Sequence, residues 1–143
     1  MTTKELLLKD LCARLNCGVE VYAQYEPTGE WYNGRLVGIN LEDEPCFTVQ
    51  FYKPVPYTNY CNKKEIKPYL RPMSSMTAEE EYEYHQYKNI DYLKICEMKH
   101  VEILKTTALC FSRATDWLNK KGFDYRGLIP MGLALEATEG MYK

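Results

Sequence analysis

Few residues of this 143-residue sequence have the types and spacing that catalysis requires. Cys96 and His100 come nearest to a nucleophile with its base, because a separation of four residues places both on one face of a helix. No orienting third residue accompanies them, and two such side chains on one helical face usually belong to a core. The sequence also lacks a P-loop, a glycine-rich dinucleotide fingerprint, an HExxH motif and a GxSxG motif. These features predict that the protein is not an enzyme.

Metal and cofactor sites are not expected either. The cysteines stand singly along the chain, with no CxxC pair and no histidine at zinc-site spacing. The glutamates between residues 79 and 83 have the pattern of a solvated helix face near a helix N-terminus, rather than of a metal or acid–base site. The sequence therefore predicts no cofactor, no metal and reduced thiols. The six cysteines are Cys12, Cys17, Cys46, Cys61, Cys96 and Cys110.

Tyrosine gives the sequence its strongest functional signal. The chain has 13 Tyr against 4 Phe and 2 Trp. Tyrosine combines a large, stiff contact surface with a polar tip, which suits interfaces, although half-buried positions of a small sheet also use it. The surplus favours recognition of a protein or peptide, and it is also compatible with a homo-oligomer.

Nucleic-acid binding is the alternative. Basic and aromatic residues interleave between residues 52 and 71, a combination that single-strand binders use for phosphates and stacked bases. However, residues 20–52 carry six carboxylates and only one basic residue, Arg35, and the formal net charge is −2. Protein or peptide recognition is therefore ranked first. The residues that would contact nucleic acid are Lys53, Lys63, Lys64, Lys67 and Arg71.

A helix is expected within residues 1–17. Thr2 and Glu5 fit a capping box, in which each side chain accepts a hydrogen bond from the backbone of the other residue. Leucines at positions 7, 11 and 15 then form an apolar stripe that would pack on a core. Gly18, which can adopt a positive φ, marks the end of the helix.

Residues 18–73 have the pattern of a small, strongly bent antiparallel β-barrel. Its short strands alternate in polarity and are separated by turn residues such as Pro27-Thr28-Gly29. Gly34 and Gly38 within the second strand indicate bending or a close backbone approach. Residues 53–64 are too many and too polar for a tight hairpin, and a loop of this kind is where recognition is expected.

Several motifs in this region resemble a Tudor domain. They are Ala23-x-Tyr25, Thr28-Gly29-x-Trp31-Tyr32-x-Gly34-Arg35-x-Val37, Val49-x-Phe51-Tyr52, Tyr57-x-Asn59 and Leu70-Arg71-Pro72. The resemblance covers under half of the chain, and the loop after Tyr52 is longer than is usual in that family. It implies a five-stranded SH3-like barrel that binds methylated lysine or arginine in an aromatic cage, where ring faces attract a weakly hydrated cation. The ligand-binding residues that it implies are Tyr25, Tyr32, Phe51, Tyr52, Tyr57 and Asn59.

Residues 74–143 are expected to form a helical subdomain on or beside the barrel. Thr77 and Glu80 fit a second capping box, which precedes a helix over residues 78–88. Residues 89–105 fit a helix only in part, and from residue 106 the apolar spacing improves until Gly122 ends the helix. A short apolar segment over residues 131–137 would then dock. Asp116, Asp124 and Arg126 are expected to form a structural polar cluster.

A second resemblance bears on the biological context. Residues 70–77, 116–119 and 123–129 resemble segments of small uncharacterised proteins from phages and prophages of gut bacteria. This implies a phage accessory protein that acts on a host factor in the host cell cytoplasm, where methylated histones are absent. The N-terminus lacks the pattern of a signal peptide, and no apolar run is long enough to span a bilayer. A cytoplasmic location without membrane association is therefore expected.

Together these features predict an α+β protein that acts as a binding or adaptor module. Its expected parts are an N-terminal helix over residues 1–17, a Tudor-like barrel over 18–73 and a helical subdomain over 74–143.

Overall fold

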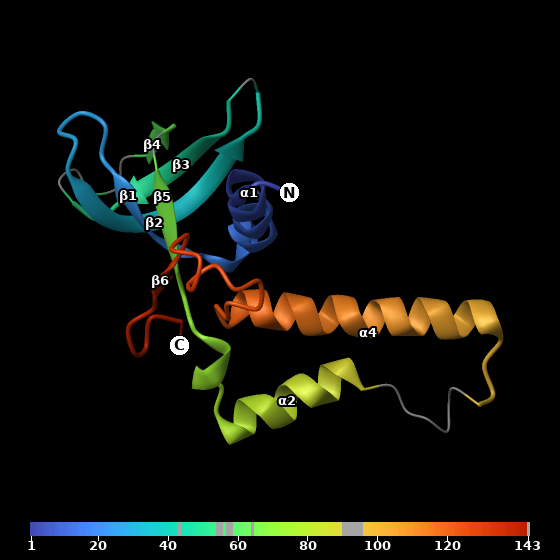
Figure 1. Cartoon of the computed structure of the whole chain (residues 1–143). Helices are drawn as coiled ribbons and strands as arrows, with labels where there is room; N and C mark the ends of the chain where they lie inside the picture. Colours follow the sequence, from blue (N-terminus) through green and yellow to red (C-terminus); the bar gives the residue numbers. More distant parts are fainter. Residues whose placement is uncertain (43, 54–55, 57–58, 64, 90–95, 143) are drawn as a thin grey trace.

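The computed structural model in Figure 1 is a mixed α+β structure. It describes residues 1–42, 44–53, 56, 59–63, 65–89 and 96–142. Three α-helices lie in this part of the chain: α1 (Thr3–Arg14), α2 (Ala78–Lys88) and α4 (His100–Lys120). The strands are β1 (Glu20–Gln24), β2 (Trp31–Asn40), β3 (Cys46–Phe51), β4 (Asn59–Asn62), β5 (Ile66–Leu70) and β6 (Leu135–Glu136).

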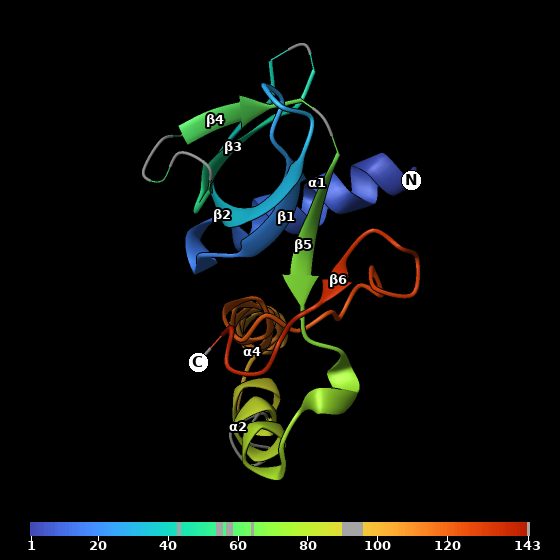
Figure 2. The ribbon, with the colours of Figure 1, turned by 90° about the vertical axis from the view of Figure 1, so that its left-hand side faces the viewer.

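The six described strands form one curved sheet in the order β4-β3-β2-β1-β5-β6. All neighbours are antiparallel except β5 and β6. The sheet is open, with β4 and β6 as the edges of its described part, so the closed barrel expected from the sequence is not confirmed (Figure 2). The strand β4 also lies within residues 53–64, which the sequence analysis assigned to a loop.

Helix α1 packs its leucines on the concave side of the sheet. The predicted capping box is confirmed, with the Glu5 N–H donating to Thr2 Oγ1 at 3.2 Å and the Thr2 N–H to Glu5 Oε2 at 2.6 Å. Leu11 is fully buried in the sheet core, and Leu7, Leu8 and Leu15 pack against that core. A short 3-10 turn follows the helix, and Gly18 then adopts φ 69°, as its position predicts. The helix therefore contributes its leucines to the core on the inner face of the sheet.

Helices α2 and α4 form a hairpin that projects away from the sheet (Figure 1). The second predicted capping box is confirmed at Thr77 and Glu80. The ambiguous stretch 89–105 is helical from His100 onward, while residues 90–95 lie outside the described residues. The base of the hairpin is held by a small core of Trp117, Leu118 and Phe123, and Gly122 follows α4 with φ 78°.

Arg71 ties the sheet to the start of α2. Its guanidinium donates from Nη1 and Nη2 to the two carboxylate oxygens of Glu80, both at 2.8 Å, and lies 4.2 Å from the centre of the Phe123 ring. These hydrogen bonds, with those from Thr77, lower the pKa of Glu80 from 4.5 to about 2. Arg71 is therefore a structural residue, which counts against its predicted contact with nucleic acid.

The Arg71–Glu80 pair predicts a specific pH dependence of stability. Because the pKa of Glu80 is lower in the folded protein, its contribution is complete above pH 4.5 and is lost as the pH falls toward about 2. Glu80→Gln is expected to lower the free energy of unfolding at pH 7 by about 1–2 kcal/mol and to flatten its decline over this window. Urea unfolding at several pH values measures this. Glu79→Gln, at the exposed neighbouring position, is the control, and an equal loss in both variants would contradict the prediction.

The expectation of reduced thiols is wrong for one pair of cysteines. Cys46 on β3 and Cys61 on β4 form a disulfide, with their Cα atoms 5.8 Å apart. Thr48 lies opposite Cys61 in the ladder, and Cys46 is two residues before Thr48, so alternation places both sulfurs on one face of the sheet. The separation of 15 residues gave no local motif from which the pairing could be recognised. The other four cysteines are free.

Candidate functional site

Three of the six predicted cage residues come together, but on the inner face of the sheet. The Tyr25 ring centre lies 6.1 Å from that of Tyr32 and 5.5 Å from that of Phe51, both edge-on. Tyr25 is 5% exposed and Phe51 is 1% exposed, because their positions alternate with outward-facing neighbours and so point into the core. Both rings are therefore packed in the core, which counts against their place in the ligand-binding cage that the resemblance implies. Tyr32 is only half-buried, and its hydroxyl donates to Glu30.

The fourth ring of this inner cluster belongs to Tyr60, which the sequence analysis did not select. Its ring centre lies 4.7 Å from that of Tyr25, and the Tyr25 hydroxyl donates to the Tyr60 hydroxyl at 2.9 Å. This hydrogen bond raises the pKa of Tyr25. Asn59, the predicted polar member, precedes Tyr60 on β4 and is exposed, since consecutive strand residues face opposite sides.

The two remaining predicted residues do not join the cluster. Tyr52 follows Phe51 directly and lies on the outer side, where its hydroxyl donates to both carboxylate oxygens of Glu20 at 2.8 and 2.7 Å. Partial burial and this hydrogen bond raise the pKa of Tyr52 to about 12. Tyr57 lies outside the described residues. The inner cluster is therefore mainly part of the hydrophobic core, where it joins the end of β1 to β2, β3 and β4.

The outer face of the sheet carries a different aromatic group, which we call the outer patch: Tyr22 on β1, Trp31 on β2 and Tyr69 on β5. The Tyr22 ring centre lies 5.2 Å from that of Trp31 and 6.5 Å from that of Tyr69. All three rings are half-buried, and the Tyr69 hydroxyl donates to Asn33 Oδ1 at 2.7 Å. Burial raises the pKa of Tyr69, and the nearby Tyr22 raises it further.

A hollow of about 240 Å³ adjoins the outer patch. Tyr22 and Trp31 line it together with Glu65, Lys67 and Leu135. It offers two partly exposed rings and an aliphatic side chain, with one acidic and one basic group beside them. Sequence alternation contained this signal, because residues 20, 22 and 24 of one strand and 31, 33 and 35 of the next all fall on the outward parity. The resemblance to Tudor domains, which bind ligands in an aromatic cage, pointed to the inner rings instead.

A larger groove of about 680 Å³ lies between α1, the start of β3 and the start of β5. Its floor is apolar and its rim carries charges of both signs, and neither histidine nor cysteine lines it. Lys63 and Lys67, two of the predicted basic residues, belong to this rim, whereas Lys53 is exposed elsewhere and Lys64 lies outside the described residues. Its lining consists of Thr3, Lys4, Leu7, Leu8, Glu44, Pro45, Phe47, Lys63, Glu65, Ile66, Lys67, Gly132 and Leu133.

No match to this chain is found among models of protein families, curated proteins or solved structures. Among the described residues, no three His, Cys, Asp or Glu side chains are grouped so that they could hold a metal ion. Cys96 and His100 are both exposed, and Cys96 precedes α4 rather than lying on it. None of the described helices is long and apolar enough to cross a membrane.

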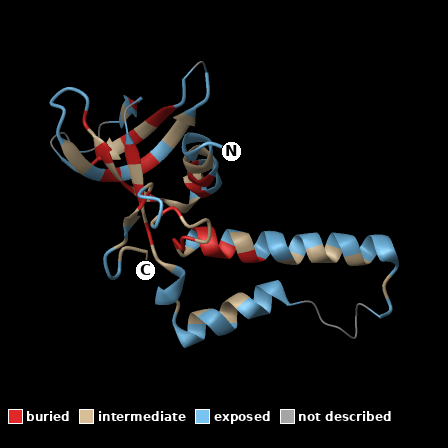
Figure 3. Cartoon of the chain, viewed as in Figure 1, coloured by how far each residue is buried: buried red, intermediate tan, exposed pale blue. Residues whose placement is uncertain are grey.

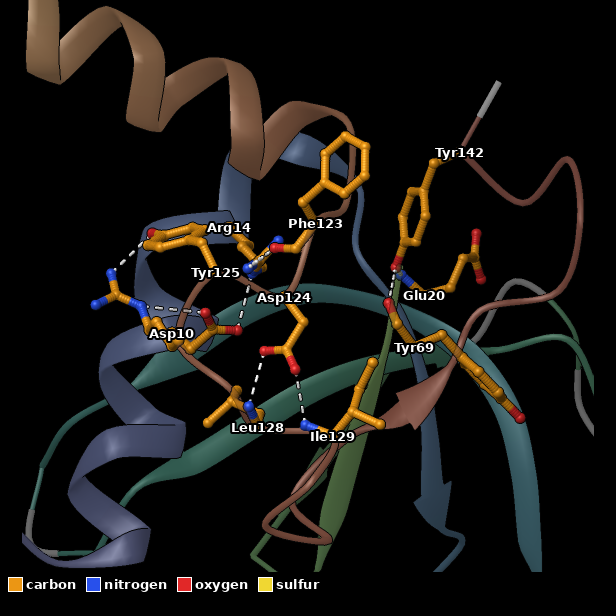
Figure 4. A network of polar contacts seen from close by, with 11 residues as sticks. Asp10, Arg14, Glu20, Tyr69, Phe123, Asp124, Tyr125, Leu128, Ile129 and Tyr142 are labelled. Carbon is orange, nitrogen blue, oxygen red and sulfur yellow. Dashed lines mark hydrogen bonds and ion pairs between the residues drawn. The ribbon is translucent and has the colours of Figure 1, made fainter. Parts of the chain in front are cut away.

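A buried polar network joins α1 to the segment after α4 (Figure 4). Asp10 accepts from Arg14 Nε at 2.8 Å and from Arg126 Nε at 3.2 Å, and Arg14 Nη2 donates to the Phe123 carbonyl at 2.6 Å. Asp124 accepts from the backbone N–H groups of Leu128 and Ile129, both at 2.8 Å. The predicted cluster of Asp116, Asp124 and Arg126 is thus wrong in its membership. Asp116 is exposed on α4, and Asp10 is the partner of Arg126.

Near the C-terminus, Tyr142 extends this connection to the sheet. Its hydroxyl donates to the Tyr69 carbonyl and accepts from the Glu20 N–H, the latter at 3.1 Å (Figure 4). These contacts hold β1 and β5 in place beneath the outer patch. The network therefore positions structural elements: Asp10 is paired with Arg14 and Arg126, and Asp124 is held by backbone N–H groups.

Proposed function

We propose that this protein is a non-enzymatic binding module that recognises a protein or peptide segment through the outer patch. The observation that carries the proposal is the contiguous set of partly exposed rings of Tyr22, Trp31 and Tyr69 beside a hollow of about 240 Å³. Aromatic side chains of this kind dominate the binding energy of protein interfaces. The rings stand on three neighbouring strands, so the sheet presents them as a rigid surface.

We retain the Tudor-like interpretation, but with a sheet that is not closed into a barrel. In support, β1 to β4 pair in sequence as an antiparallel meander, and β5 pairs antiparallel with β1 on its other side. A small SH3-like barrel also needs the pairing of its last strand with its first, and here leucines of α1 pack on the same core. We place the recognition surface outside the curve of the sheet because the inner rings of Tyr25 and Phe51 are committed to the core.

Charge favours a polypeptide over nucleic acid as the partner. Glu65 lies beside the outer patch together with Lys67, and Glu20 lies on the neighbouring part of β1. Phosphate groups would meet these carboxylates, and Arg71 is already engaged by Glu80. A polypeptide with apolar or proline side chains meets no such repulsion.

Removing the Trp31 ring, the largest of the outer patch, tests the proposal. Peptides selected from a displayed random library against the full chain are expected to bind Trp31→Ala at least 30-fold more weakly than wild type, as for a hot spot worth about 2 kcal/mol. Trp31 is half-buried at the start of β2, so the variant should remain folded, which circular dichroism checks. Isothermal titration of the selected peptides measures the change.

The control replaces a tyrosine far from the outer patch. Tyr82 on α2 is 70% exposed, and Tyr82→Ala is expected to leave peptide affinity unchanged. Selected peptides that bind wild type and Trp31→Ala equally would refute the outer patch as the site. A library that yields no binder, together with single-stranded oligonucleotides that bind with a steep salt dependence, would refute the function in favour of nucleic-acid recognition.

A further inference from the structure

Helix α4 carries two apolar stripes, and only one of them has a partner within the described chain. The first follows the spacing 103, 107, 110, 114 and 117, which is a 4-3-4-3 repeat. Its members Ala114 and Trp117 are buried and the others are half-buried. Trp117 contacts Tyr84 of α2, with the ring centres 5.8 Å apart. This stripe faces α2 and the base of the hairpin.

The second stripe, which we call the free stripe, consists of Val101, Leu104, Ala108 and Phe111. Its 3-4-3 spacing is that of a helix–helix seam, and it contains no charged residue. Val101 is 61% exposed, Leu104 58% and Phe111 56%. The outer two-thirds of α4, where the free stripe lies, project beyond the body of the protein (Figure 3). Exposed apolar surface of this regularity marks an interaction site rather than scattered surface residues.

We propose that the free stripe binds the free stripe of a second copy of this chain, with the two α4 helices antiparallel. A two-fold axis at the level of Thr106 places Leu104 opposite Ala108 of the second copy, and Val101 opposite Phe111. Each layer then joins a larger side chain to a smaller one, which lets the helices approach closely. The stripe is thus complementary to itself, a property that a closed dimer requires.

Because the hairpin projects away from the sheet, two chains can pair through α4 without a collision between their sheets. About 11 residues separate the axis from Trp117 at the base of the hairpin, a distance of about 16 Å at 1.5 Å per residue. An antiparallel pair therefore places the two bodies at opposite ends of the paired helices, about 30 Å apart. Neither sheet, outer patch nor groove is covered, so the dimer would present two copies of the proposed binding surface.

The area of the free stripe agrees with a modest dimer. Three large side chains, each more than half exposed, offer on the order of 100 Å² apiece. Two copies with their flanking polar groups would bury roughly 1,000 Å², the lower limit of a specific interface. We expect a micromolar dissociation constant, as for small transient interfaces, so that the monomer–dimer equilibrium is visible at ordinary protein concentrations.

Sedimentation equilibrium of the purified full chain, from about 1 to 100 μM, tests the proposal. Wild type is expected to shift from 16.8 kDa to twice that mass as the concentration rises. Leu104→Glu places a charge in the seam twice per dimer and is expected to weaken dimerisation at least tenfold. Leu109→Glu is the matched control, because Leu109 is 50% exposed on the same helix but lies about 100° around the axis from Ala108.

Each possible result either supports or overturns the free stripe as the dimer interface. A dimer that persists in Leu109→Glu and dissociates in Leu104→Glu supports the free stripe. Wild type that stays monomeric at the highest concentration overturns the proposal and leaves the stripe to a different partner or to none. Equal behaviour of the two variants, whether both dimerise or neither does, overturns the assignment of the surface. Both substitutions are at exposed sites, and the helical circular dichroism signal verifies that each variant is folded.

Discussion

Asp10→Asn is expected to lower the free energy of unfolding by about 3–5 kcal/mol. Asp10 and Arg14 are both fully buried, and the carboxylate is the acceptor for two guanidinium groups. The substitution keeps the shape of the side chain but removes its charge, so Arg14 remains in the interior without a counter-ion. Such a loss is a large share of the total stability of a domain of this size. Urea unfolding at neutral pH measures it.

Two further variants separate the charge effect from a general loss of packing. Arg126 is 19% exposed and approaches the same carboxylate at 3.2 Å, so Arg126→Met is expected to cost only about 1 kcal/mol. The double variant Asp10→Leu/Arg14→Met replaces the pair with apolar groups and is expected to regain much of the loss of Asp10→Asn. A loss below 1 kcal/mol in Asp10→Asn would show that the pair is solvated and would refute its structural role.

Local sequence signals predicted the helices well because their causes are local. A capping box joins two residues only three positions apart, and it satisfies backbone N–H groups of the first helical turn. The pairs Thr2–Glu5 and Thr77–Glu80 could therefore be recognised in the sequence and are present in the structure. Gly18 and Gly122 likewise act on their own backbone, with φ of 69° and 78°. Helices α1 and α2 and the end of α4 could be placed from the sequence for this reason.

Contacts between distant segments could not be predicted in this way. Arg71 was grouped with its basic neighbours because nothing nearby in the sequence revealed its two hydrogen bonds to Glu80 on the following helix. Cys46 and Cys61 meet only because β3 and β4 pair. Closure of the sheet likewise depends on whether β4 meets β5, and alternation within each strand carries no information on that pairing.

The candidate site could have been predicted in part. Alternation assigns Tyr25 and Phe51 to the inner parity and Tyr22 to the outer one, and the structure follows it. The tyrosine surplus indicated functional tyrosines, but the resemblance to the Tudor family pointed to the inner set and not to the outer patch. The outer patch needs three strands in register, which the order of β2, β1 and β5 supplies.

Gly34→Ala is expected to destabilise the protein by about 2–3 kcal/mol, through overpacking rather than through backbone conformation. A Cβ at this position of β2 would lie 2.7 Å from the Gln50 carbonyl oxygen, 2.8 Å from Val49 Cγ1 and 3.1 Å from Phe51 Cα. Two of these atoms belong to the backbone of β3, which cannot move aside without breaking the ladder. The sequence indicated either bending or a close approach at this glycine, and the close approach is confirmed.

The second glycine of β2 supplies the matched control. A Cβ on Gly38 would meet Thr48 at 3.4 Å, which is ordinary contact, so Gly38→Ala is expected to change stability by less than 1 kcal/mol, because any added crowding is offset by the reduced entropy of the unfolded chain. The difference arises from the β-bulge between Leu36 and Gly38, which alters the register so that only Gly34 faces the β3 backbone closely. If urea unfolding shows that both substitutions cost the same, the register of β2 against β3 is wrong. The outer patch would be unaffected by that result, because Trp31 is placed beside Tyr22 by the pairing of β1 with β2 and not by the pairing of β2 with β3.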